Sequence, residues 1–242
     1  FAGLGDTSAV LMLVFKDTIT GLAAGVRLTS NDMLHKGDWI TVKSVDANGI
    51  VEDMSLTTVK VRNFDNTIVT ISPTTLVNGS FQNWIGMQKS GGRRVKRVVY
   101  FDFRSVRLVD ETLKCTLLTK HFATEDSFKL KESLQKAIDK DIQEGKDIED
   151  LKNPAALAPT NLQLYRKFME KYLRQRPEVN TDLTLMVRHM EATQCGLPIE
   201  FYFFIKDKVW VNYEHILADI MEHAYALANE FGLKIYEQYP EQ

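Results

Sequence analysis

Large apolar residues recur at helical spacing near the start of the chain. Within FKDTITGLAAGVRL, residues 15–28, they are Phe15, Ile19, Leu22 and Val26. Spacings of three and four residues predict a helix with one apolar face. Between them the chain carries only small residues at Gly21, Ala23, Ala24 and Gly25. Each glycine costs a helix about 0.5–1 kcal/mol relative to alanine, so this thin face is expected to serve a close contact.

The segment before this face is apolar only over a short distance. The run from Ala9 to Phe15 is about a third of the length that a bilayer-spanning helix needs, and Lys16 and Asp17 interrupt it. A helix exposed to lipid is therefore not expected. A helix inside a bundle tolerates such residues, and small side chains let neighbouring helices approach closely. An ordinary amphipathic helix with one small-residue contact is an equally good interpretation.

After Asn31 the pattern changes to short stretches in which apolar and polar residues alternate. This alternation predicts strands over residues 40–45, 49–54, 56–62 and 67–71. Turn residues at 46–49 and 64–66 connect them as hairpins. Short strands with short turns are typical of a small β barrel. The aromatic residues Trp39, Phe64, Phe81 and Trp84 are scattered, which favours core filling over a nucleic-acid platform.

The rest of the chain mixes strands and helices. Strands are expected over 97–109, 181–192 and 197–206, and helices over 127–145, 161–176 and 211–232. Thr160 caps the second of these helices and Pro177 ends it. This order predicts an α+β sandwich of ferredoxin-like type.

Composition adds limits on the class of protein. The chain has 242 residues, 44% of them hydrophobic and 26% charged, which is ordinary for a globular protein with a substantial core. The formal net charge of −2 gives no overall signal for binding polyanions. Cys115 and Cys195 form no spacing motif, which favours reduced thiols in the cytosol. No signal peptide is recognisable. Because the first residue is Phe1 rather than Met, we expect an N-terminal part to be missing.

No catalytic motif is present, and we expect neither an enzyme nor a cofactor. Phosphate-binding loops, dinucleotide-binding glycine patterns and nucleophile elbows are all absent. His215, Asp219 and His223 share one stripe of a helix and have ligand chemistry, but the apolar residues lie on the other face, so a metal site is not favoured. Cys195 and His189 lack an orienting third residue.

One concentrated basic run, SGGRRVKR at residues 90–97, leads into the second half of the chain. A solvated linker between domains is the favoured interpretation. Contact with phosphate or lipid head groups is the alternative.

The order of helix, small β domain and α/β domain, with the segments TGLAAGV and LHKGDWITV, resembles the small-conductance mechanosensitive channel family. The resemblance is closest to its bacterial miniconductance branch of YbdG type. Family members carry a Leu-Ala-Ala-Gly segment, here Leu22 to Gly25, and then a Gly-acidic-aromatic-aliphatic segment, here Gly37 to Ile40. Ser72-Pro73-Thr74 departs from the Pro-Asn that the family often has at its last β strand.

The resemblance implies three parts: a pore-lining transmembrane helix over residues 1–31, an Sm-like β domain over 32–95 and a cytosolic α/β domain over 96–242. It implies a homoheptamer in the bacterial inner membrane, with membrane lipids and permeating ions as partners and without nucleic acid. Tension would open it on hypoosmotic shock by favouring the conformation with the larger in-plane area.

The resemblance also assigns residues. The two constricting positions of the pore fall on Ala9 and Leu13, and because Ala9 is small the gate could shift to Phe15. A bend is expected at Lys16 and Asp17, where a charge cannot lie unpaired in lipid. Residues 18–30 would then run along the interface and pack on the β domain. Close packing between neighbouring pore helices is expected at Gly21, Ala24 and Gly25.

Two other functions fit the same sequence. The first is an Sm-like protein that binds nucleic acid, although the negative net charge disfavours it. The second is a membrane-associated scaffold with this fold that does not conduct ions.

Overall fold

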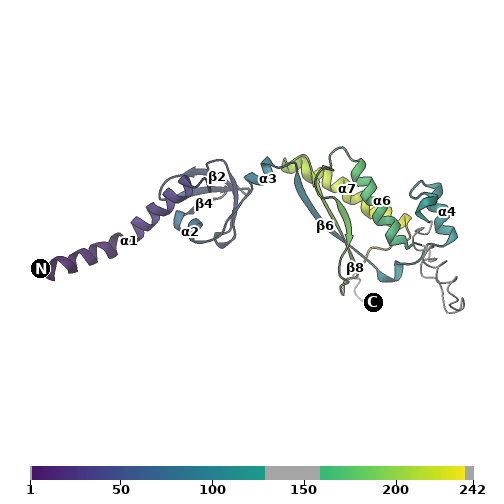
Figure 1. Ribbon diagram of the computed structural model, residues 1–242, viewed down its shortest axis with the longest axis horizontal. Helices are drawn as coiled ribbons and strands as arrows, with labels where there is room; N and C mark the ends of the chain where they lie inside the picture. The colour runs from purple at the N-terminus through teal and green to yellow at the C-terminus, as the bar shows by residue number, and fades with distance from the viewer. Residues whose placement is uncertain (1, 129–158, 238–242) are drawn as a thin grey trace, which may run out of the picture. The chain divides into compact units, whose positions relative to one another are not determined.

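The computed structural model describes residues 2–128 and 159–237, with side chains from Phe15 onward. The chain divides into two compact units, a first unit of Phe1–Ser90 and a second unit of Gly91–Gln242. Figure 1 labels several of the helices and strands of each unit, and each unit is described by itself.

The first unit begins with a long helix and continues as a small antiparallel sheet. Helix α1 spans Ala2–Ser30. The five strands have the order β4-β3-β2-β1-β5 in the sheet. Their bounds are β1 Trp39–Val42, β2 Ala47–Met54, β3 Val59–Asn63, β4 Ile68–Ile71 and β5 Gln82–Asn83. The short helical segments are η1 Lys43–Val45, α2 Pro73–Asn78 and α3 Ile85–Lys89.

The alternation in the sequence predicts β1, β2, β3 and β4, whereas β5 was not expected. Every neighbouring pair is antiparallel, and Asp46 and Asn66 adopt positive φ in the two expected turns. The inward-facing residues form one core with residues of α1 and α2. Its fully buried members are Leu28, Leu34, Ile40, Val42, Ala47, Val51, Val59, Val61, Ile71 and Leu76.

Helix α2 starts at Ser72-Pro73-Thr74, the segment noted above as a departure from the Pro-Asn of the family that the sequence resembles. The Ser72 hydroxyl accepts a hydrogen bond from the Thr75 amide at 3.2 Å, and Pro73 occupies the first helical turn, where no backbone N–H is needed. This short helix packs against α1, which is helical through residues 18–30. The course of these residues along a membrane interface stays a prediction.

The second unit is a three-stranded antiparallel sheet of order β6-β8-β7, with helices on one face. The strands are β6 Arg93–Phe101, β7 Met186–His189 and β8 Leu197–Ile205. The helical segments are η2 Phe103–Ser105, α4 Glu111–Thr119, η3 Glu125–Ser127, α6 Asn161–Gln175 and α7 Trp210–Glu230. An isolated bridge pairs Ile235 with Phe101, so the last described residues run beside β6.

Alternate residues of β6 and β8 face α6 and α7. Phe101, Phe201 and Phe203 are fully buried there, together with Tyr165 of α6 and Phe231 at the end of α7. Asn161 is also fully buried, because its amide donates to the carbonyl oxygens of Ser105 and Phe231 at 2.9 and 3.0 Å. A buried amide with its hydrogen bonds made fixes the start of α6 against two other segments.

Several expected elements of this unit differ in extent. Helix α6 and helix α7 lie where the sequence predicts them. The strand expected over 181–192 is only Met186–His189, and β6 starts at Arg93, four residues before the strand that we expected. The helix expected over 127–145 falls almost entirely outside the described residues.

Candidate functional site

The C-terminal half of α1 is seated on the first unit through its thin face. Ala24 is 5% exposed and Leu28 is fully buried in the core. Gly25 lies against the backbone of Leu56, in the turn between β2 and β3, so closely that a Cβ built on Gly25 would stand 2.1 Å from the Leu56 carbonyl oxygen. Only glycine fits at this contact without a shift of backbone.

This contact changes the interpretation of the thin face. The sequence predicts that Gly21, Ala24 and Gly25 pack against a neighbouring helix, but Ala24 and Gly25 have their close partners within the same chain. The reason is that a small residue marks a close approach without saying which segment approaches. A Cβ at Gly21 would lie 3.9 Å from Thr74 Oγ1, an ordinary contact, so packing between subunits at Gly21 stays a prediction.

The opposite face of the same helix is exposed. Its large apolar residues, which are Phe15, Ile19, Leu22 and Val26, are 51%, 60%, 45% and 49% exposed. They follow one another at helical spacing and so form a single stripe, the apolar stripe of α1. A stripe of this kind marks a surface that packs against something else.

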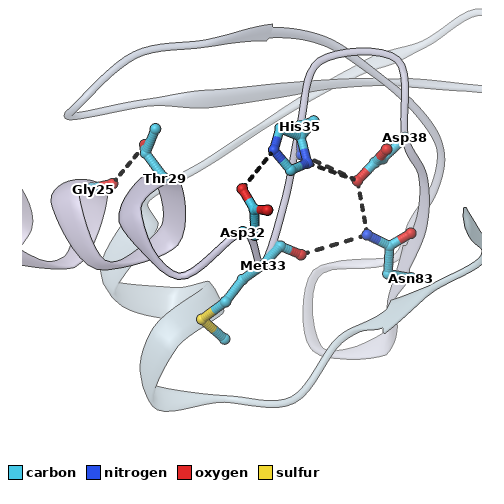
Figure 2. A network of polar contacts seen from close by, with 7 residues as sticks. All are labelled: Gly25, Thr29, Asp32, Met33, His35, Asp38 and Asn83. Atoms are coloured by element: carbon cyan, nitrogen blue, oxygen red, sulfur yellow. Dashed lines mark hydrogen bonds and ion pairs between the residues drawn. The ribbon is translucent and has the colours of Figure 1, made fainter.

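A polar network ties the end of α1 to the start of the sheet (Figure 2). Its centre is Asp38, whose side chain is only 9% exposed. Asp38 Oδ2 accepts from the backbone amide of His35 at 3.1 Å and from Asn83 Nδ2 at 2.8 Å. The same Asn83 amide reaches the carbonyl oxygen of Met33 at 3.4 Å. One carboxylate therefore joins the segment after α1 to β5, 45 residues further along the chain.

The His35 side chain extends this network to the end of the helix. Its Nε2 lies 3.2 Å from Oδ1 of Asp32, which follows α1 in a left-handed conformation. Within α1, the Thr29 hydroxyl donates to the Gly25 carbonyl at 3.0 Å (Figure 2). Gly37 has φ +94°, which strains any other residue, and this lets the chain turn so that Asp38 points back into the network.

Residues proposed for the pore lie in the N-terminal half of α1. The helix passes through Ala9 and Leu13, whose side chains are outside the described ones, and Phe15 belongs to the apolar stripe. The helix is continuous from Ala2 to Ser30 and is not interrupted at Lys16 and Asp17. The bend expected at these two residues stays a prediction. Over residues 2–128 and 159–237, no helix has the length and apolar character needed to cross a membrane.

The other chemical candidates have local contacts. His223 Nδ1 lies 2.6 Å from the carbonyl oxygen of Asp219, and its ring stacks on Tyr172. No group of three potential metal ligands occurs in the described part of the chain. Cys195 is exposed in the tight turn between Thr193 and Gly196, and its amide donates to Thr193 Oγ1.

The basic run at residues 90–97 is largely a strand rather than a linker. Arg93 begins β6 and lies over the Tyr213 ring, 4.3 Å from its centroid. Lys96 Nζ is 3.6 Å from the buried carboxylate of Glu200, which also accepts from Arg188 Nε at 2.6 Å. The sequence did not predict a strand here because this run has too few apolar residues to show an alternating pattern.

Asn83 and Leu56 contribute contacts to the candidate site that sequence reasoning missed. Asn83 lies in a two-residue strand with no periodic signal, and Leu56 contributes backbone atoms rather than a side chain. The Gly37-Asp38-Trp39-Ile40 segment was the available signal for the network, although the sequence gives its acidic residue no partner.

Comparison with known proteins finds relatives of this region. Residues 17–86 match the family model described as the β-domain of the mechanosensitive ion channel. The small-conductance mechanosensitive channel MscMJ of Methanocaldococcus jannaschii is 34% identical over 82 residues, which cover 34% of this chain and 23% of that protein. The uncharacterized MscS family protein YhdY of Bacillus subtilis is 31% identical over 88 residues, covering 36% of this chain and 23% of that protein.

Solved structures extend the likeness to the whole chain at the level of the fold. Helicobacter pylori MscS in its closed state matches with a TM-score of 0.60 at 14% identity, covering 100% of this chain and 71% of that one. Arabidopsis thaliana MSL1 matches with a TM-score of 0.61 at 10% identity, covering 98% of this chain and 64% of that one. The chain spans about a quarter of the length of the curated relatives named above.

Proposed function

We propose that the protein is a mechanosensitive ion channel of the MscS family, opened by membrane tension to release ions and small solutes. The observation that carries this proposal is the match of residues 17–86 to the β-domain of such channels, together with relatives that are channels or MscS family proteins. The match includes both the seated half of α1 and the Asp38 network. The two together join the C-terminal half of α1 to the sheet of the first unit.

The packing of α1 supports a way for tension to reach the first unit. Gly25, Ala24 and Leu28 hold the C-terminal half of the helix on the sheet, while the apolar stripe is left for contacts with lipid or with other membrane segments. Tension that widens the membrane part would pull on the stripe, and the seated face would pass the displacement to the sheet. Tension shifts the equilibrium between the closed and open states only by the difference between the lateral work that it does on each state.

The remaining features of the proposal come from the likeness to the family. We place residues 1–31 along the pore, with a constriction at Leu13, or at Phe15 because Ala9 is small, and a bend at Lys16 and Asp17. A ring of apolar side chains closes such a pore by dewetting. The assembly is a homoheptamer in the bacterial inner membrane, with the C-terminal domains in the cytoplasm. No cofactor takes part in opening.

The finer fold and branch assignments belong to the same proposal. The antiparallel sheet of the first unit is consistent with an Sm-like barrel, and the order β6, α6, β7, β8, α7 is consistent with a ferredoxin-like domain. The miniconductance branch rests on the segments around Leu22–Gly25 and Gly37–Ile40.

Survival of hypoosmotic shock tests this function. Bacteria lacking their own mechanosensitive channels are transformed with the full-length protein and diluted suddenly from high to low osmolarity. A channel restores survival, whereas a scaffold or a nucleic-acid-binding protein with the same fold leaves the cells as sensitive as the vector control. Membrane fractions probed for the protein make a negative result informative.

A further inference from the structure

A cavity of about 280 Å³ lies in the second unit, between helix α6 and the segment from His121 to Ser127. This volume is close to the lower end of the range of about 300–1,000 Å³ for pockets that bind small molecules. The proposed channel function gives the cavity no role, since it is far in sequence from α1 and the Asp38 network.

The floor of the cavity is aromatic and fixed. Phe122 and Phe168 meet edge to face at 5.1 Å between ring centroids, and both lie within 5.7 Å of the fully buried Phe231 ring. Tyr172 lines the same cavity and stacks on His223. Since these rings pack on the core of the unit, they form a rigid apolar surface that can hold a planar body.

The rim of the cavity is cationic. Lys167 and Lys171 lie one helical turn apart on α6 and are exposed, and His121 lines the cavity from the segment opposite. Among the described residues that line the cavity, none has a carboxylate. Like charges at this spacing repel and destabilise a helix, so an anion bound between the two lysines would relieve this repulsion.

Within the described part of the chain, other lysines of the second unit, unlike the two at the cavity, form ion pairs with carboxylates. Lys120 pairs with Glu230, and Lys114 pairs with Glu111 at 3.6 Å. Neither Lys167 nor Lys171 has an ion pair with any residue of 2–128 or 159–237. Glu170, which precedes Lys171, accepts instead from the Val187 amide at 3.0 Å. Among the described residues, the two ammonium groups at the cavity thus have no carboxylate partner, and an apolar floor lies beside them.

We propose that this cavity binds a small organic anion that has a planar apolar body and a phosphate or carboxylate group. The body lies on Phe122 and Phe168, and the anionic group lies between Lys167, Lys171 and His121. Burial raises the pKa of Tyr172, more than Arg176 lowers it, so the phenol keeps its proton and can donate to the ligand. The cavity is too small for the chains of a diacyl lipid.

Calorimetric titration of the full chain with phenyl phosphate tests this site. We expect saturable binding that is at least tenfold tighter than the binding of inorganic phosphate, because phosphate lacks the planar body. The double variant Lys167→Gln/Lys171→Gln should weaken phenyl phosphate binding at least tenfold. Arg174→Gln removes the same charge from α6 outside the cavity and should change the affinity less than twofold.

Three results would overturn the proposal. Absence of saturable binding excludes the site, and equal affinity for phenyl phosphate and inorganic phosphate excludes the role of the aromatic floor. If Arg174→Gln weakens phenyl phosphate binding as much as the double variant does, the effect comes from the overall charge of α6 and not from a site at the cavity. Cosedimentation with phosphatidylglycerol vesicles separates the sources of the anion: a vesicle affinity that depends on Lys167 and Lys171 assigns the lysines to a lipid head group and contradicts the small-molecule site. None of these results depends on channel activity.

Discussion

Gly25 of the first helix and Leu56 of the turn between β2 and β3 are in contact so close that no side chain fits between them. A Cβ built on Gly25 would stand only 2.1 Å from the Leu56 carbonyl oxygen. The two neighbours of Gly25 in the helix lie on opposite faces, since Ala24 is buried against the first unit and Val26 is exposed. The contact makes the end of α1 part of the first unit.

Gly25→Ala should therefore destabilise the first unit, although alanine is the better helix former. Overpacking costs about 1–3 kcal/mol, which exceeds the gain of about 0.5–1 kcal/mol in helix propensity. The matched control is Gly21→Ala, whose Cβ would lie 3.9 Å from Thr74 Oγ1 and which should be neutral or stabilising. In a Trp210→Phe background, urea unfolding followed by tryptophan fluorescence reports the first unit through Trp39 and Trp84. Equal stability changes in the two variants would contradict the contact.

Truncation of a leucine to alanine should affect the stability of the first unit differently on the two faces of α1. Leu28→Ala removes a fully buried side chain and should cost the first unit about 2–5 kcal/mol. Leu22→Ala removes a side chain that is 45% exposed and should stay within about 0.5 kcal/mol in the same urea experiment. If the full-length protein is the proposed channel, Leu22→Ala should also shift its tension threshold, since the apolar stripe is the proposed link to the membrane. An unchanged threshold would exclude the stripe from that role.

Asp38→Ala should loosen the connection between α1 and the sheet. The substitution leaves the His35 amide and the Asn83 side chain without their acceptor, at an expected cost of about 1–3 kcal/mol. Asp32→Ala, which removes an exposed carboxylate from the other side of His35, should cost no more than about 1 kcal/mol. Native-state hydrogen exchange at the His35 amide measures the difference. Protection of that amide in Asp38→Ala equal to the parent's would show that the network is not a restraint.

Leu13→Ser tests the proposed gate. A hydroxyl in place of the apolar side chain should let water into the constriction and lower the tension at which the channel opens. The comparison is Phe15→Ser, because Phe15 is the alternative gate. A lower threshold in Phe15→Ser alone would move the gate to that residue, and thresholds equal to the parent's in both variants would place it elsewhere.

Much of this architecture could be predicted from the sequence, because its signals are local. The alternation around Val59 and Val61 places β3, and the apolar stripe from Phe15 to Val26 places the helix. The partner of the thin face could not be predicted, since Gly25 meets backbone atoms of Leu56 and any residue type supplies those. Asn83 was missed for a related reason. Its hydrogen bond to Asp38 joins residues 45 positions apart, which only the folded sheet brings together.

The second unit shows the same limit on its polar residues. The basic run at 90–97 has a composition typical of linkers, yet Arg93 and Lys96 lie in a strand whose partners, Tyr213 and Glu200, are more than a hundred residues away. Composition describes the solvent preference of such residues, whereas the fold decides whether a ring or a carboxylate lies beside them.

Current recorded from membrane patches under graded suction tests the central claim most directly. The full-length protein is purified, reconstituted into liposomes and its presence in the patched membrane verified. The account predicts discrete channel openings whose probability rises with suction and falls when suction is released, with protein-free liposomes as the silent control. Patches that contain the protein and stay silent up to the tension at which the membrane ruptures would contradict it.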